Sequence, residues 1–212
     1  MANSPRWVRQ FYFLSLSEES HLDEIELFPL EGTPPYDFRC NRDEQNVFLH
    51  TRAHSDQRDG FSVTYLAYYK GVTAGYMTLA MDAVPLQTKE KPRSDIRIVK
   101  FPAVKLAQLA VDHRWEGRGL GKQLVALAAA IALRLRLQVG CRYLTVDSKA
   151  DLSGWYESQE FKVNKIARKE QEQRAAHSGV EVESLPISMR LDLFSLLADL
   201  HDRYRSDFPD QP

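Results

Sequence analysis

The feature that most constrains this chain is the stretch Leu106–Gln123, in which an apolar segment runs into three glycines and then into a helical pattern. The glycines Gly117, Gly119 and Gly121 form a Gly-x-Gly-x-Gly turn. Glycine lets the backbone adopt positive φ and approach a ligand closely. The first turn of a helix adds unpaired N–H groups and the positive end of the helix dipole. The sequence therefore predicts a strand–turn–helix unit that binds an anion such as a pyrophosphate.

Other glycine-rich turns are the alternatives to this interpretation, and the plainest of them is a connector that binds no ligand. The Rossmann and P-loop patterns need other glycine spacings, and no Gly-Lys-Ser/Thr sequence is present in this turn. The turn also lies in mid-chain, after three or four predicted strands, whereas a Rossmann turn follows the first strand. These differences favour a phosphate-binding turn of another kind.

Periodicity and turn residues predict alternating strands and helices around this unit. Strands are expected at Phe11–Leu16, Phe61–Tyr69, Val72–Met81, Ile96–Val111 (interrupted near Pro102), Tyr143–Asp147, Phe161–Ile166 and Leu185–Leu193. Helices are expected at Glu18–Leu27, Asn41–Ala53 (with Val47, Leu49 and His50 available to pack inward), Gly121–Leu137, Asp151–Ser158 and Phe194–Tyr204. The alternation predicts the α/β class, α+β by some definitions, with one domain over residues 1–193 and a C-terminal helix and tail over residues 194–212.

Composition and charge limit the compartment and the partners. The hydrophobic and charged contents of 43% and 27% are those of an ordinary globular protein, and no apolar run is long enough to span a membrane. No signal peptide is recognisable, so the cytoplasm is the expected compartment. Cys40, Cys141 and the six histidines show no spacing typical of a disulfide framework or a metal site. Residues 61–150 carry a net charge of +8 between acidic flanks, which indicates a local anionic ligand or a chance distribution of solvated charges.

These motifs resemble those of the GNAT superfamily of N-acetyltransferases. The resemblance rests on Leu109-Ala110-Val111, on Glu116–Gly121, and on the downstream Trp155-Tyr156 and Phe161, and it extends from about Tyr36 to Leu193. In order and spacing these residues match the family's Q/R-x-x-G-x-G/A pyrophosphate turn and its later tyrosine. The resemblance implies a mixed, splayed β-sheet flanked by helices, with acetyl-CoA lying in the splay and no metal.

The resemblance also implies roles for individual residues. It assigns the binding of acetyl-CoA to Leu109, Ala110, Val111, Glu116, Gly117, Arg118, Gly119, Leu120, Gly121, Lys122, Lys149 and Tyr156. The backbone of Leu109 and Val111 would hold the thioester oxygen and the pantetheine arm, and the Leu109 N–H would polarise the carbonyl. The amides of Arg118, Gly119, Gly121 and Lys122 would surround the pyrophosphate. Tyr156 would be the general acid for the leaving thiolate, and the alternative for it is a purely packing role.

Two residues depart from the family pattern. Glu116 stands where the family prefers Gln or Arg, which places a carboxylate near the phosphates unless its side chain turns to solvent. Glu160 replaces the glycine that usually precedes Phe161. Neither change removes a backbone amide from the turn.

A narrower resemblance connects the chain to the GNAT toxins, on Phe38-Arg39-Cys40, Phe48–Ala53, Gly75–Leu79 and Lys105–Gly121. That subfamily acetylates the α-amine of aminoacyl-tRNA and is neutralised by a small DNA-binding antitoxin, so tRNA and an antitoxin become candidate partners. The subfamily's glycine after the cysteine is Asn41 here, and the pI near 6.6 is low for a tRNA binder. A non-catalytic acyl-CoA-binding module is the alternative from another class, and a homodimer is left open.

The absence of an obvious base bears on the acceptor. Many GNAT enzymes have a glutamate on the strand occupied here by Ala107-Gln108, and Gln108 is a poor proton acceptor. A lysine amine with a pKa of about 10.4 would be neutral in one molecule in about 2,500 at pH 7, a penalty of about 4.6 kcal/mol. An α-amine with a pKa of about 7.7–8.0 loses only about 1 kcal/mol. The acceptor is therefore expected to be a primary amine, with a low-pKa amine favoured, although Asp112, His113, His54 or a water chain remain alternative bases.

Overall fold

The protein was analysed as a computed structural model, which describes residues 25–93, 95–178, 181–182 and 185–197. The chain forms two compact units. Unit 1 comprises Met1–Met81 and Leu106–Ile131, and unit 2 comprises Asp82–Lys105 and Ala132–Pro212. The predicted strand Phe11–Leu16 lies outside the described residues.

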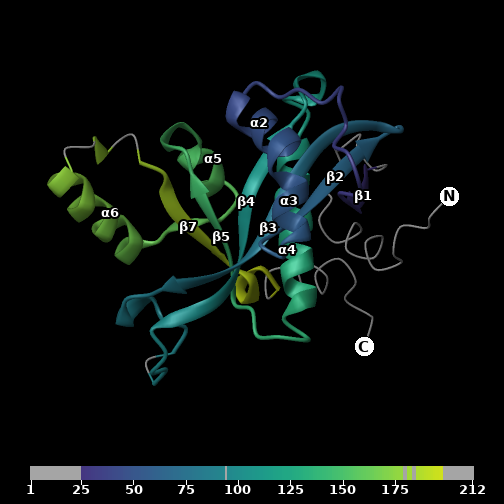
Figure 1. The fold of residues 1–212 in the computed structure, drawn as a ribbon. Coiled ribbons are helices and arrows are strands. Elements are labelled where there is room, and N and C mark those ends of the chain that lie inside the picture. Colours follow the sequence, from purple (N-terminus) through teal and green to yellow (C-terminus); the bar gives the residue numbers. More distant parts are fainter. Residues whose placement is uncertain (1–24, 94, 179–180, 183–184, 198–212) are drawn as a thin grey trace. The chain divides into compact units, whose positions relative to one another are not determined.

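Unit 1 carries the strands β1 and β2 (Figure 1), and it also contains the glycine turn. Its elements are β1 (Ile25–Pro29), α2 (Asp43–Thr51), α3 (Ala53–Arg58), β2 (Val63–Tyr69), most of β3 (Val72–Pro85), the second half of β4 (Lys100–Val111), the 3-10 turn η2 (His113–Trp115) and most of α4 (Leu120–Leu135). The predicted hairpin is confirmed, because β2 and β3 pair antiparallel with Tyr69 opposite Val72. Lys70 and Gly71 have φ of 50° and 78°, as a tight hairpin turn with positive φ at both central residues requires.

The core of unit 1 lies between the helices α2 and α3 and the sheet. It contains Leu30, Phe38, Leu49, Ala53, Leu66, Tyr76 and Ala110. The predicted helix over Asn41–Ala53 is confirmed as α2 and the start of α3, and Leu49 is fully buried. Val47 and His50 are exposed, so the prediction that they pack inward is wrong. Tyr76 on β3 links the sheet to α2, because its hydroxyl donates a hydrogen bond to the backbone carbonyl of Gln45 at 2.9 Å.

Unit 2 contains the remaining strands and helices. Its elements are η1 (Thr88–Glu90), β5 (Tyr143–Ser148), η3 (Ala150–Leu152), α5 (Ser153–Glu157), β6 (Lys162–Val163), α6 (Lys165–Ser178) and β7 (Ile187–Asp192). β7 pairs antiparallel with both β5 and β6. The core contains Val84, Leu86, Phe101, Ala103 and Tyr143. Beside it Arg190 and Glu90 form an almost fully buried ion pair at 3.0 Å.

The strands follow the order β1-β2-β3-β4-β5-β7-β6 in a seven-stranded sheet. Its outer pairings are antiparallel, whereas β4 and β5 are neighbours joined through helix α4, the kind of crossover that parallel strands require. The sheet is therefore mixed and flanked by helices, which confirms the predicted α/β class.

Three predicted elements differ from the structure. Ile25 and Leu27 belong to β1, not to a helix, because they alternate with exposed Glu26 and pair with β2. β4 continues through Pro102, which lies near the start of the strand, where a missing N–H is tolerated. The Pro102 carbonyl accepts a hydrogen bond from the Arg142 N–H at 2.8 Å.

The third difference is the strand predicted over Phe161–Ile166, which ends at Val163. The buried Asn164 donates from its amide to the Ser188 hydroxyl at 3.0 Å and accepts from Arg190 at 2.9 Å. The backbone carbonyl of Asn164 accepts a hydrogen bond from the Arg168 N–H at 2.9 Å, and α6 begins at the next residue. Of the predicted C-terminal helix Phe194–Tyr204, residues 193–197 are helical, and the rest lies outside the described residues.

Candidate active site

The glycine turn lies on unit 1 between η2 and the start of α4. Gly117 and Gly119 have φ of 73° and 83°, a conformation that disfavours any residue with a side chain. Both are exposed, and a Cβ built on either glycine would meet no atom within 4 Å. The backbone here is therefore open to a ligand. With the N-terminal N–H groups of α4 beside it, the turn fits an anionic group such as a pyrophosphate.

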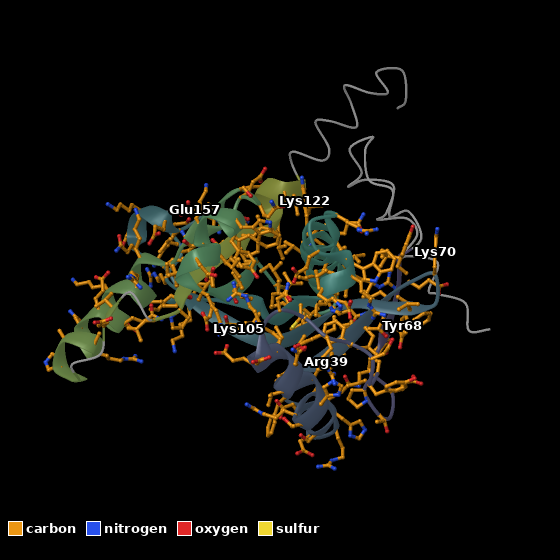
Figure 2. The ribbon with its side chains drawn as sticks, turned by 90° about the horizontal axis from the view of Figure 1, so that it is seen from above. Arg39, Tyr68, Lys70, Lys105, Lys122 and Glu157 are labelled. Carbon is orange, nitrogen blue, oxygen red and sulfur yellow. The ribbon has the colours of Figure 1, made fainter. Side chains whose placement is uncertain are left out.

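Two cations and an aromatic pair border the turn. Lys122 is exposed on the first turn of α4 (Figure 2). The Arg118 guanidinium lies 5.2 Å from the Trp115 ring centroid, and Trp115 packs edge-on against Tyr69 at 4.8 Å. The Trp115 indole Nε1 is buried and makes no hydrogen bond within the described residues. Positive charge and an unused donor therefore lie next to the turn.

Glu116 does not extend freely into the turn. Its Oε2 accepts a hydrogen bond of 2.5 Å from the amide of Asn41, a residue 75 positions earlier in the chain. These two residues are both departures from the family patterns noted in the sequence. The amide of one therefore holds the carboxylate of the other.

The segment Leu109–Val111 forms the end of β4. Ala110 is buried in the core of unit 1, and Leu109 and Val111 are half-buried on the other side of the strand. Gly75 on β3 makes a close approach here, because a Cβ at Gly75 would lie 2.9 Å from the Ala110 carbonyl oxygen. The packing of β3 therefore fixes the position of the backbone that leads into the turn.

Asp112 follows β4 directly and is fully buried. Its carboxylate accepts hydrogen bonds from the backbone N–H groups of Arg39 and Arg114, both at 3.0 Å, and from the Arg114 guanidinium at 2.7 and 3.0 Å. Burial raises the pKa of Asp112, but these hydrogen bonds lower it by more, so that the net shift is downward. An ionised carboxylate with its oxygens occupied is a poor base, so Asp112 is a structural group and not the proton acceptor considered from the sequence.

The two histidines considered as bases are both exposed on unit 1. The His113 Nδ1 lies 2.9 Å from the Arg39 carbonyl oxygen, which can only accept, and 3.5 Å from the Asp112 Oδ1, so this nitrogen carries a proton. His54 lies on α3. Of the two, only His113 is near the end of β4 in sequence, two residues beyond Val111.

Tyr156 and Lys149 belong to unit 2, whereas the predicted site residues from Leu109 to Lys122 all belong to unit 1. Tyr156 lies on α5, and its side chain is buried. Its ring packs edge-on against Trp155 at 4.8 Å and Phe161 at 5.4 Å. Lys149 is half-buried and immediately precedes η3.

The sequence interpretation missed the structural role of Asp112 and its neighbours. Asp112 accepts from the N–H two residues later and caps η2, and an aspartate in that relation to Arg114 is a recognisable turn signal. The long-range contacts of Asp112 with Arg39 and of Asn41 with Glu116 had no signal in a single sequence. In the part of the chain that the structure describes, no group of three or more His, Cys, Asp or Glu side chains is arranged to hold a metal.

None of the described helices combines the length and the apolar character of a membrane span.

Solved structures with this fold include several toxins. A bacterial toxin crystal structure matches with a TM-score of 0.67 at 14% identity, over 84% of this chain and 95% of the other. AtaT complexed with acetyl-methionyl-tRNAfMet matches with a TM-score of 0.65 at 20% identity, over 82% and 98% of the two chains. AtaTR bound with AcCoA matches with a TM-score of 0.63 at 22% identity, over 83% and 98%.

The sequence profile of the acetyltransferase (GNAT) family matches residues 22–161, which include the strands β1 to β5, the glycine turn and Tyr156. This range is well over half of the chain. The predicted family and the predicted enzyme class are confirmed: this chain belongs to the acetyltransferase (GNAT) family.

Proposed function

We propose that this protein transfers the acetyl group of acetyl-CoA to a primary amine by direct attack in a ternary complex. The observation that carries the proposal is the exposed turn with positive φ at Gly117 and Gly119, which follows β4 and η2 and leads into α4 in a member of this family. Backbone N–H groups at a helix start suit a pyrophosphate, the most highly charged part of the donor's linker. The structure of AtaTR bound with AcCoA, which has the same fold, supports the choice of donor.

In the proposed reaction the amine nitrogen attacks the thioester carbonyl carbon, the C–S bond breaks, and the amine loses a proton to water or a base. The Leu109 N–H stabilises the developing oxyanion, as donors fixed at such a position do in acyl transfer. Amides of Arg118, Gly119, Gly121 and Lys122 hold the pyrophosphate. Tyr156 donates its proton to the departing thiolate. Lys149 and the backbone of Glu116 and Leu120 complete the proposed donor site.

The favoured acceptor is an amine that is partly neutral without help. Asp112 is removed as a base by its buried hydrogen bonds, and Gln108 on β4 cannot serve. The remaining candidate on this segment, His113, is exposed, and its Nδ1 contacts the Arg39 carbonyl. An α-amine with a pKa of about 7.7–8.0 needs no strong base at neutral pH, whereas a lysine amine does.

The α-amine of an aminoacyl-tRNA is the second, narrower candidate for the acceptor. Six of the basic residues in the central block lie between Lys89 and Lys105 and four between Arg134 and Lys149, all of them in unit 2 and not on the unit that carries the glycine turn. Three of these ten, Arg93, Lys105 and Arg142, pair with aspartates, and the remaining excess of positive charge is of the kind that the phosphates of a tRNA backbone attract. The complex of AtaT with acetyl-methionyl-tRNAfMet supports the same acceptor. An antitoxin and a second copy of this chain are the corresponding candidate protein partners.

A panel of acceptors tests both levels of the proposal. Purified protein is incubated with acetyl-CoA and, separately, with aminoacyl-tRNAs, free amino acids, lysine peptides and polyamines, and the release of CoA thiol is followed. The proposal predicts thiol release above spontaneous hydrolysis with at least one amine, fastest with an α-amine. The Tyr156→Phe variant is the matched control, because it removes one hydroxyl. Thiol release with no member of the panel would overturn the proposed transfer, and release only with lysine or polyamine amines would overturn the tRNA acceptor.

A further inference from the structure

Two segments far apart in sequence meet at the buried carboxylate of Asp112. One segment, Asp37–Asn41, leads into α2, and the other, Asp112–Glu116, leads into the glycine turn. The Asp112 Oδ2 accepts the Arg39 N–H at 3.0 Å, and the Arg39 carbonyl accepts the His113 N–H at 2.9 Å. The two backbones are thus connected in both directions at this point.

Further contacts extend this connection toward both ends. At one end the Arg114 guanidinium donates two hydrogen bonds to Asp112, at 2.7 and 3.0 Å, and also lies 3.7 Å from the Asp37 carboxylate. At the other end the Asn41 amide donates to Glu116, the residue immediately before Gly117. The segment before α2 therefore lies along the whole approach to the turn, and Asp112 is its buried centre.

The chemistry at Asp112 makes this centre rigid. Four N–H groups, two from backbone and two from one guanidinium, point at a carboxylate that has no exposed surface. Hydrogen bonds to an ionised acceptor are shorter and stronger than neutral ones, and the planar guanidinium adds directional specificity. The Arg114 side chain is partly exposed, but the Asp112 carboxylate is closed to water, so removing its charge would weaken all four hydrogen bonds donated to it.

We propose that Asp112 is a positioning residue for donor binding, which holds the backbone of the Glu116–Gly121 turn in register through the Asp37–Asn41 segment. Asp112 touches no substrate itself. It acts through Arg39, Arg114 and the backbone that runs from η2 into the turn. This inference rests on the proposed function, because the turn is taken to bind the pyrophosphate of acetyl-CoA.

The test compares two acetyl donors that differ only beyond the pantetheine arm. The parent protein and Asp112→Asn are assayed with acetyl-CoA and with acetyl-pantetheine, which lacks the pyrophosphate, using the best acceptor from the panel. Asparagine keeps the size of the side chain but removes the charge and one acceptor oxygen. Asp59→Asn is the matched control, since it makes the same change at an exposed ion pair with Arg58 on the same unit.

The expected result is a selective loss with the full donor. For Asp112→Asn the kcat/KM with acetyl-CoA falls about tenfold or more, the change expected from loss of a charge-assisted hydrogen bond, and the KM for acetyl-CoA rises. Its kcat/KM with acetyl-pantetheine stays within about threefold of the parent value. Asp59→Asn changes neither donor.

A purely structural aspartate would give a different pattern. Asp112→Asn would then melt earlier, but the ratio of the two kcat/KM values, measured well below the melting temperature, would equal that of the parent, and this result overturns the inference. If Asp112→Asn does not fold, Arg114→Gln replaces it, because that variant keeps the Arg114 N–H and removes only the guanidinium, and the same ratio decides. Failure of the parent protein itself to use acetyl-CoA would refute the proposed function instead.

Discussion

Replacing Gly75 by alanine should destabilise the protein, because the new methyl group has no room. The added Cβ would lie 2.9 Å from the Ala110 carbonyl oxygen, 3.1 Å from Leu124 Cδ1 and 3.5 Å from Leu120 Cδ2. The leucine methyls can rotate aside, but the Ala110 oxygen belongs to the backbone of β4 and cannot. The strands must therefore separate by a few tenths of an ångström. Overpacking of this kind costs about 1–3 kcal/mol, which for a chain of this size lowers Tm by about 2–4 °C per kcal/mol.

The matched control is Gly154→Ala on α5, where a Cβ would meet nothing within 4 Å. Alanine in a helix is favoured over glycine by about 0.5–1 kcal/mol, so this variant should be as stable as the parent or slightly more stable. Urea unfolding at 25 °C, followed by circular dichroism, measures both. Because Ala110 lies between the residues proposed to hold the thioester, Gly75→Ala should also weaken acetyl-CoA binding. Equal stability of Gly75→Ala and the parent would refute the argument from close packing.

Three further predictions follow from other parts of the molecule. Tyr156→Phe should keep acetyl-CoA affinity and ring packing but lose about 10²-fold in turnover; steady-state kinetics within about threefold of the parent would exclude Tyr156 as the acid. The hydrogen bonds to Asp112 hold its pKa below the ordinary aspartate value, so its stabilisation is present well above the unfolded-state pKa and is lost as the pH falls through the folded-state pKa. Acid titration of unfolding should therefore show a weaker pH dependence of stability in Asp112→Asn, and identical curves for the two proteins would contradict this. Truncation after Leu193 removes Phe194, whose ring centroid lies 5.0 Å from the Arg136 guanidinium and 4.3 Å from that of Arg142. The truncated protein should melt at a lower temperature but keep its affinity for acetyl-CoA, as measured by calorimetry. Loss of acetyl-CoA binding by a folded truncation would contradict the prediction that the tail is dispensable.

Local sequence signals were sufficient for most of the fold. Lys70-Gly71 between two β-branched and aromatic runs predicted the β2–β3 hairpin, because few residues adopt positive φ at both central positions of a turn. The periodic leucines and alanines after Gly119 predicted α4 to within two residues at each end. The glycine spacing placed the open turn between β4 and α4, where the structure has it.

The structure differs from the sequence prediction where tertiary contacts determine the local conformation. Val163 ends β6 because Asn164 bonds to β7, and Pro102 stays within β4, where its carbonyl accepts the Arg142 N–H. The role of Asp112 depends on Arg39, 73 residues earlier, and a single sequence carries no record of that proximity. The chemistry of Tyr156 was inferred from family resemblance, since nothing in its local sequence distinguishes an acid from a packed ring.

Titration of acetyl-CoA into the purified protein by calorimetry tests the central claim, that the glycine turn of unit 1 binds the acetyl donor. The parent should bind with a micromolar Kd, and the melting temperature should rise with donor concentration, because a ligand specific to the folded state stabilises it. Gly119→Glu places a side chain and a negative charge at a residue with φ of 83°, and it should bind no donor while remaining folded. Absence of binding by the parent, or equal affinity of a folded Gly119→Glu, would contradict the account.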